Sequence, residues 1–160
     1  MKHLHFDVET DGFYGAYWAC AGGSSCAVIA MIGDDPEDWL ARSAVKWLCG
    51  RGVNVLTMSP AKKDYGHHNY PLERVETAIS WLKANGNHKI GIAGASTTGT
   101  LALTAAAMFP DITLTIAMTP SDFVWQGFMQ GKRDGCKEWP VEGESLFSLS
   151  LIHISEPTRP

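Results

Sequence analysis

Residues 89–99 read Lys89-Ile90-Gly91-Ile92-Ala93-Gly94-Ala95-Ser96-Thr97-Thr98-Gly99, an apolar segment, a serine flanked by small residues, and then an alanine-rich segment. The pattern predicts a strand, a sharp turn at Ser96 and a helix. This arrangement is typical of a nucleophile elbow, in which the serine hydroxyl stands above the sheet and small neighbours let the backbone pass close by. The helix behind it offers amide donors and a favourable dipole to an oxyanion. We therefore expect Ser96 to be a nucleophile, with Gly94 and Gly99 as the elbow glycines.

The match to the elbow pattern G-x-S-x-G is near rather than strict. Thr98 stands two residues after the serine, and Gly99 follows one place later. The alternative is an ordinary strand–helix junction in which Ser96 caps the helix, since serine and threonine are common caps. Gly94 before the serine and the expected elements on both sides favour the elbow.

Composition limits the classes of protein to consider. The chain has 160 residues, of which 45% are hydrophobic, and a net charge of -4. These values predict one soluble globular domain with no general attraction for nucleic acid or anionic membranes. No segment approaches the ~20 apolar residues of a spanning helix, and residues 1–7 lack the apolar region of a signal peptide. The sequence therefore predicts a cytoplasmic protein with no membrane span and no nucleic-acid partner.

Neither the cysteines nor the paired histidines indicate a cofactor. The adjacent His67-His68 pair falls in a polar stretch and is expected to be solvated loop surface. The cysteines lack C-x-x-C spacing, which favours reduced, packed thiols over a zinc site or a disulfide framework. They are Cys20, Cys26, Cys49 and Cys136. No metal ion or other cofactor is expected.

The first half of the chain alternates strand and helix patterns, which predicts a mostly parallel sheet with helices on both faces. Residues 13–20 and 26–32, separated by Gly22-Gly23-Ser24-Ser25, are expected to form a hairpin. Asp35-Pro36-Glu37-Asp38 predicts an N-cap and first turn of a helix. The apolar face expected for this helix is Leu40, Ala44, Trp47 and Leu48.

The second half continues the alternation. A strand is expected over 53–58, a polar loop that could line a site over 59–70, and a helix from Pro71 onward. The buried stripe expected for that helix is Leu72, Val75, Ile79 and Leu82. After the elbow we expect a helix over 97–109 and a buried parallel strand over 112–118.

From residue 120 to 143 the alternation gives way to aromatic and glycine residues. This segment is either a lid over the site or a surface excursion with a few packed aromatic side chains. Lys132-Arg133 within it either meets a substrate phosphate or is a solvated basic pair. Both pairs of alternatives stay open at this point.

The run from Gly94 to Gly99, continued by Pro110-Asp111-Ile112-Thr113-Leu114-Thr115-Ile116-Ala117-Met118-Thr119-Pro120-Ser121-Asp122-Phe123-Val124-Trp125, carries a family resemblance. Over residues 27–140 the chain resembles an α/β-hydrolase of the acyl-CoA thioester hydrolase and bile acid-CoA:amino acid N-acyltransferase C-terminal family. The resemblance implies the N-terminal part of an α/β-hydrolase fold, with a mostly parallel sheet that is incomplete on its C-terminal side.

The resemblance also implies nucleophilic acyl transfer, with Ser96 attacking the carbonyl of a small-molecule ester or thioester, such as an acyl-CoA. A serine rather than a cysteine at this position favours hydrolysis over amino-acid conjugation. The oxyanion would be held by the Thr97 N–H and by a second N–H from the turn after residues 26–32, at Gly33 or Asp34. That turn has no H-G-G-G motif, so the second donor is assigned by position alone.

The catalytic acid and base are missing from this chain. In this fold they follow the serine in the order Asp or Glu, then His. Asp111, Asp122 and Asp134 come too soon after the elbow; Asp122 is the best placed of them but reads better as a cap or loop anchor. His153 is the sole histidine after Ser96 in the sequence.

The last twelve residues explain this gap. Residues 149–159, Leu149-Ser150-Leu151-Ile152-His153-Ile154-Ser155-Glu156-Pro157-Thr158-Arg159, resemble a translated sequencing adapter. We therefore expect a truncated domain over 1–148 and a non-native tail over 149–160, with His153 having no catalytic role. Such a chain would be inactive. A carboxylesterase or dienelactone-hydrolase-like enzyme, and a non-catalytic binding module on the same scaffold, remain as alternatives.

Overall fold

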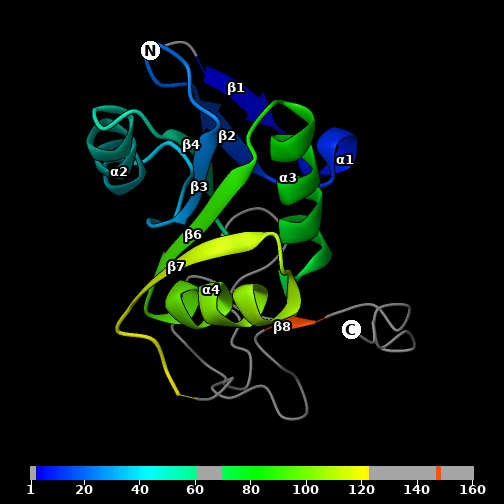
Figure 1. Ribbon diagram of the computed structural model, residues 1–160. Helices are drawn as coiled ribbons and strands as arrows, with labels where there is room; N and C mark the ends of the chain where they lie inside the picture. Colours follow the sequence, from blue (N-terminus) through cyan, green and yellow to red (C-terminus); the bar gives the residue numbers. More distant parts are fainter. Residues whose placement is uncertain (1–2, 61–69, 123–146, 149–160) are drawn as a thin grey trace.

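The computed structural model describes residues 3–60, 70–122 and 147–148 (Figure 1). The main strands are β1 (His3–Phe6), β2 (Gly15–Trp18), β3 (Cys26–Met31), β4 (Asn54–Met58), β6 (Lys89–Ala95) and β7 (Ile112–Met118). The helices are α1 (Val8–Asp11), α2 (Trp39–Cys49), α3 (Glu73–Ala84) and α4 (Thr97–Met108). Two short strands, β5 (Tyr70–Pro71) and β8 (Phe147–Ser148), pair with each other.

The six main strands form one sheet in the order β1-β2-β4-β3-β6-β7. Strand β2 runs antiparallel to β1 and β4, whereas β4, β3, β6 and β7 are mutually parallel. Parallel neighbours need a crossover between them, and α2, α3 and α4 supply the three crossovers. The predicted mostly parallel sheet is confirmed.

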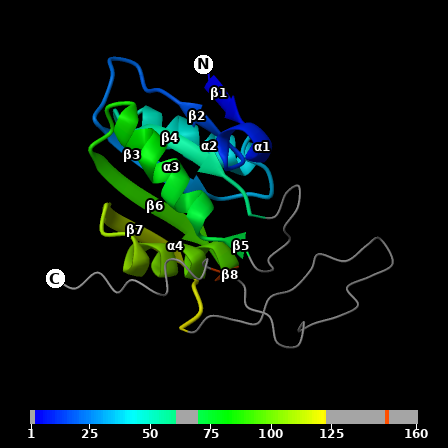
Figure 2. The ribbon, with the colours of Figure 1, turned by 90° about the vertical axis from the view of Figure 1, so that its right-hand side faces the viewer.

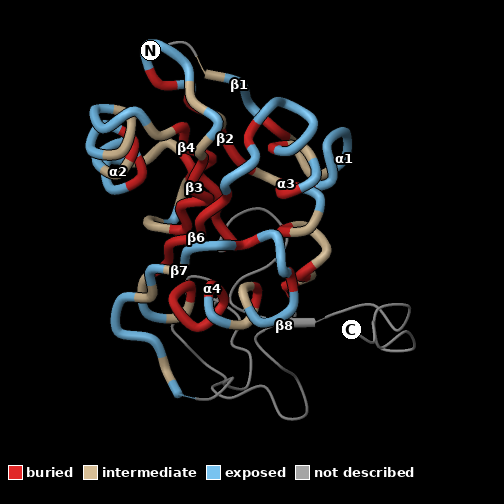
Figure 3. Tube along the Cα trace, in the orientation of Figure 1, coloured by how far each residue is buried: buried red, intermediate tan, exposed pale blue. Residues whose placement is uncertain are grey.

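Helices cover both faces of the sheet, as predicted. Figures 1 and 2 show α2 on one side of the central strands and α3 on the other. Successive residues of β3 point to opposite faces, so that Val28 packs with Val45 of α2 while Ile29 packs with the cluster that contains α3 and α4. The most buried backbone lies in β3, β4 and β6 (Figure 3). The elbow segment therefore starts from the centre of the molecule.

The hairpin predicted for residues 13–20 and 26–32 is wrong. Strand β4 lies between β2 and β3, and β2 pairs with β4 in antiparallel register. Asn54 at the start of β4 holds the connecting loop, because its side chain accepts the Cys20 N–H at 3.0 Å and donates to the Ser24 carbonyl at 3.0 Å. A strand that is apolar on both faces is most stable in the middle of the sheet, and β3 takes that place.

The start and the buried face of α2 also differ from the prediction. The N-cap is Asp38, whose carboxylate accepts the Ala41 N–H at 2.8 Å, and Asp35 instead accepts the Glu37 N–H within the preceding turn. This shift places Ala41 and Val45 against the sheet. The expected face residues Leu40 and Trp47 are exposed, and Ala44 and Leu48 are half-buried.

The second half agrees more closely with the sequence. Strand β4, helix α3 with buried Leu72, Val75, Ile79 and Leu82, and helix α4 before Pro110 all lie where they are expected. Strand β7 has the predicted bounds and is parallel to β6, but it is not buried as predicted. It is the edge strand of the sheet, and Leu114, Ile116 and Met118 are exposed. These three alternate residues share one face of the sheet, and that face is exposed at β7.

Several expectations concern residues outside the described part of the chain. They are the loop with His67-His68, the aromatic segment with Lys132-Arg133, Asp134 and Cys136, and the tail with His153. Of the helices that the structure describes, none has the length and apolar character required to cross a membrane.

Candidate active site

Ser96 stands at the junction of β6 and α4 in a strained backbone conformation. Its φ is 55° and its ψ is -120°, and among the described non-glycine residues only Thr119 also has a positive φ. Such a conformation costs of order 1–3 kcal/mol and persists where surrounding contacts enforce it. The Ser96 N–H donates to the Met118 carbonyl of β7 at 2.9 Å, and the Ser96 carbonyl accepts the Thr100 N–H at 3.2 Å.

The Ser96 side chain is exposed and does not cap the helix. Ser96 occupies the N-cap position of α4, but its hydroxyl makes no capping hydrogen bond. An ordinary capping serine has an extended backbone and accepts an N–H of the first turn through its side chain. The geometry is that of a sharp strand-to-helix turn that presents the hydroxyl at the carboxyl edge of the sheet.

Thr98, which departs from the strict elbow pattern, ties the turn to a neighbouring strand. Its Oγ1 accepts the Ala95 N–H at 2.9 Å and donates to the Met31 carbonyl at 2.6 Å. The Ala95 carbonyl also lies 2.9 Å from this oxygen, but the hydroxyl has a single proton and Met31 is the nearer acceptor. Thr98 is buried and thus fixes the end of β6 against the end of β3.

Gly94 and Gly99 lie where the backbone segments pass closest. A Cβ built on Gly94 would overlap the Thr98 carbonyl group, so only glycine fits beneath the first turn of α4. A Cβ on Gly99 would lie 3.0 Å from the Met118 carbonyl oxygen, which is tighter than ordinary van der Waals contact. Both glycines therefore have the close-approach positions that an elbow requires.

The turn after β3 lies at the same edge of the sheet. Met31 pairs with Gly94 in parallel register. Gly33 lies two residues after Met31, just as Ser96 lies two residues after Gly94, so both residues follow the carboxyl ends of neighbouring strands. Gly33 has a φ of 98°, and a Cβ there would overlap the Asp38 carboxylate. The Asp34 N–H donates to Asp38 Oδ2 at 2.8 Å, and the Asp34 carbonyl accepts the Ser59 hydroxyl at 2.8 Å.

Asp38 and Thr98 have roles at this edge that were not predicted from the sequence. Asp38 gathers the N–H groups of Asp34, Asp35 and Ala41, and so fixes the turn that follows β3. An aspartate just before an apolar helical stripe is a sequence signal for this role. The link from Thr98 to Met31 joins residues far apart in the sequence and has no local signal.

The aspartates considered as catalytic acids fall in different places. Asp111 lies at the opposite edge of the sheet, before β7 begins, and pairs with Lys83 at 2.7 Å. Asp122 follows the carboxyl end of β7 and is exposed. The neighbouring Ser121 N–H donates to Thr100 Oγ1 at 3.0 Å, which anchors this segment on α4.

The described cysteines are free thiols that lie away from the elbow. Cys20 is buried, and Cys26 and Cys49 are half-buried. Burial, and to a smaller extent the nearby Cys20, raises the pKa of the Cys49 thiol. A raised thiol pKa lowers the thiolate fraction and therefore the reactivity.

Comparisons with known proteins support the architecture. No protein-family model matches the sequence, and no curated protein matches it either. Among solved structures, the chain is similar to the α/β hydrolase GrgF from Penicillium sp. sh18, with a TM-score of 0.60 and 24% identity over 74% of this chain. It is similar to Est1E from Butyrivibrio proteoclasticus, with a TM-score of 0.55 and 20% identity over 75% of this chain. An esterase from Pyrococcus furiosus matches 74% of this chain with a TM-score of 0.54 and 20% identity.

The match covers only part of each of these structures. It spans 45% of the Penicillium protein, 48% of the Pyrococcus esterase and 51% of Est1E, so the chain is similar to about half of each. At these identities the similarity establishes architecture. The strand order, the crossovers and these neighbours together show that the chain has the α/β-hydrolase fold.

Proposed function

We propose that the intact protein is a serine-dependent acyl hydrolase, with Ser96 as its nucleophile. The observation that carries this proposal is the strained, exposed backbone turn at Ser96, held by the Met118 carbonyl and by Thr98. Strain of this kind is concentrated at functional sites. A serine that only connected a strand to a helix could adopt an unstrained backbone conformation, without the cost in free energy of a positive φ.

In the proposed reaction the Ser96 Oγ attacks the carbonyl carbon of an ester or thioester while a base takes its proton. The leaving alcohol or thiol departs with a proton, and water then cleaves the acyl-enzyme. The oxyanion is held by the Thr97 N–H at the start of α4 and by the N–H of Gly33. Gly33 is preferred to Asp34 because the Asp34 N–H is directed to Asp38.

Two separate observations bear on the class of substrate. The sequence resemblance favours acyl-CoA thioesters, whereas the Pyrococcus structural neighbour is named an esterase. The substrate in either case is a small acyl compound. With one acyl group held constant, comparison of kcat/KM for its CoA thioester and for its simple ester decides between thioesterase and esterase.

We also propose that the acid and base lie beyond Ser148 in the intact protein. The tail over 149–160 resembles an adapter translation, and the chain spans about half of its structural neighbours. On this proposal residues 1–148 are a truncated domain that does not turn over, since loss of the histidine base costs many orders of magnitude in rate. Sequencing the gene across codon 148 tests this: the frame should continue through an Asp and then a His.

The alternative that the sequence left open is a non-catalytic binding module on this scaffold. A reading frame that continues without an acid and a histidine would support that alternative. A frame that supplies both, with activity abolished by Ser96→Ala, would support the hydrolase.

A further inference from the structure

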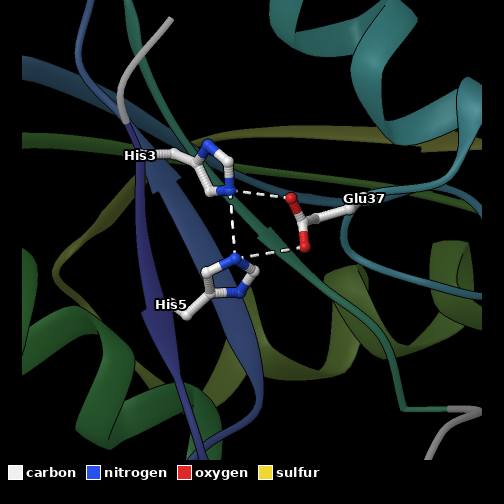
Figure 4. A group of neighbouring side chains, drawn as sticks. All are labelled: His3, His5 and Glu37. Atoms are coloured by element: carbon white, nitrogen blue, oxygen red, sulfur yellow. Dashed lines mark hydrogen bonds and ion pairs between the residues drawn. The ribbon is translucent and has the colours of Figure 1, made fainter.

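Three side chains with metal-binding atoms converge at the outer edge of the sheet, far from the elbow in the strand order. His3 and His5 alternate along β1 and therefore point to the same face, and Glu37 approaches them from the turn before α2 (Figure 4). His3 Nε2 lies 2.7 Å from Glu37 Oε1, and His5 Nε2 lies 3.3 Å from Glu37 Oε2. The two Nε2 atoms are 3.1 Å apart.

When Glu37 is ionised, hydrogen atoms alone do not satisfy these three contacts. Each Nε2 carries at most one proton, and a carboxylate carries none. If both rings donate to Glu37, their two N–H groups lie side by side with the nitrogens only 3.1 Å apart. If instead one ring donates to the other, the accepting nitrogen turns a lone pair toward a carboxylate oxygen. With Glu37 ionised, each arrangement therefore leaves two like groups next to each other, and a cation bound by the three side chains would replace that contact.

The separations suit a single metal ion of the zinc type. Ligand atoms about 2.0–2.1 Å from such an ion, at angles between square and tetrahedral, stand roughly 2.9–3.4 Å from one another. The two Nε2 atoms, 3.1 Å apart, already lie in this range, and each faces its own oxygen of the Glu37 carboxylate, at 2.7 Å for His3 and 3.3 Å for His5. All the ligand atoms of the group lie within 4.8 Å of one another.

The surroundings orient the ligands and leave one side open. The His3 ring stacks on Trp18 with centroids 4.0 Å apart, and Arg42 Nε donates to the Glu37 carbonyl at 2.7 Å. The Arg42 guanidinium also lies 3.5 Å from Glu37 Oε1 and opposes a cation there, so this contact must loosen on binding. The His5 side chain is 61% exposed, which gives water access to a remaining coordination position.

We propose that His3 Nε2, His5 Nε2 and the Glu37 carboxylate bind one Zn²⁺ ion, with water completing the coordination. Imidazole and carboxylate ligands suit this ion, and three protein ligands leave one tetrahedral position free. The ion fastens edge strand β1 to the turn that precedes α2, the same turn whose start carries Gly33. This proposal departs from the expectation of no metal ion, which rests on His67-His68 and the cysteines and not on the His3 and His5 pair of β1.

Metal titration of the tag-free 160-residue chain tests the site. Co²⁺ replaces Zn²⁺ as a visible probe, since its absorption bands report ligand number, and Zn²⁺ then displaces it. The variants are His5→Ala, His3→Phe, which keeps a ring on Trp18, and Glu37→Gln. His88→Ala, an exposed histidine before β6, is the matched control. We expect one ion per chain, affinity reduced ~10-fold or more by each ligand variant, and no change in the control.

The outcomes separate this site from others. Absence of a saturable one-to-one complex in the unaltered chain overturns the proposal. So does binding that survives both His5→Ala and Glu37→Gln, or binding that is lost in the double variant His67→Ala/His68→Ala. Far-UV circular dichroism of each variant accompanies the titration, and because His5 is largely exposed, its variant keeps the test valid even if His3→Phe does not fold.

Discussion

The Thr98 hydroxyl lies 2.6 Å from the Met31 carbonyl oxygen and joins the first turn of α4 to the last residue of β3. This bond links the two segments that would supply the nucleophile and the second oxyanion donor. Glycine, the residue of the strict elbow pattern at this position, has no hydroxyl with which to make it. Thr98 therefore holds the turn between β6 and α4 against the neighbouring strand.

Replacing Thr98 with valine keeps the shape of the side chain and removes its hydroxyl. We expect the free energy of unfolding to fall by about 2 kcal/mol, because the Ala95 N–H and the Met31 carbonyl lose a buried partner. Urea denaturation measures the change. Thr98→Ser should recover most of it, and Thr104→Val, which removes a hydroxyl bonded within α4, should cost less. Equal losses for Thr98→Val and Thr104→Val would contradict the role of the Met31 bond.

Gly94→Ala should destabilise the chain far more than the same change at Gly91. A methyl group at Gly94 overlaps the Thr98 carbonyl, whereas at Gly91 the nearest atoms stand 3.4 Å away in ordinary contact. We expect a loss of about 3 kcal/mol at Gly94 and under about 1 kcal/mol at Gly91, since rigid backbone cannot yield to overpacking. Thermal or urea unfolding of both variants gives the comparison, and similar values for the two would show that the elbow backbone is free to move.

Asp38→Ala removes both the cap of α2 and the anchor of the preceding turn. We expect a loss of about 1–2 kcal/mol in unfolding free energy, the usual cost of an N-cap. Asp111→Ala is the control, because its exposed pair with Lys83 should contribute under about 1 kcal/mol. Amide exchange of Asp34 should also accelerate in Asp38→Ala, since its N–H loses its acceptor. Unchanged exchange at Asp34 would contradict the anchoring role.

Tyr70 gives the fold a sensitivity to alkaline pH. Burial raises the pKa of this phenol, and the nearby Arg74 offsets only part of the shift. The proton is held more tightly in the fold than in the unfolded chain, where the pKa is about 10. Stability is therefore unaffected below about pH 10 and falls above it, by up to ~1.4 kcal/mol per pH unit. Denaturation between pH 9 and 11 measures this slope, which Tyr70→Phe should reduce; an identical slope in both proteins would exclude Tyr70 as the cause.

The features predicted correctly from the sequence are those that local patterns encode. The apolar runs of β4 and β6 and the stripe of α3 each lie within one short segment, so their periodicity and end signals are sufficient. The partner of β2 could not be found in this way, because the loop between β2 and β3 has the composition of a hairpin turn. Its true arrangement depends on Asn54, which bonds the loop from a strand about thirty residues later.

In the candidate site, too, the residues that were predicted from the sequence lie in one short segment, and those that were not predicted depend on contacts between separate segments. Gly94, Ser96 and Gly99 lie within six residues of one another, and the structure gives each of them the conformation or close approach that is typical of an elbow. Asp38 and the His3, His5 and Glu37 group depend on contacts between separate segments. The exposed β7 edge also depends on strand order, since an apolar run such as Ile112–Met118 looks the same in sequence whether or not a neighbour covers it.

Trapping the acyl-enzyme is the most direct measurement of the role of Ser96. The experiment uses the protein encoded by the gene as it continues past codon 148. This protein is mixed with a short-chain acyl-CoA, and the reaction is quenched in acid. After digestion, the mass of the peptide that contains Ser96 is measured by mass spectrometry. If Ser96 is the nucleophile, that peptide carries one acyl group on Ser96, and Ser96→Ala abolishes both the adduct and turnover. Turnover that persists in Ser96→Ala, or an acyl group found on another residue, would contradict the proposed mechanism.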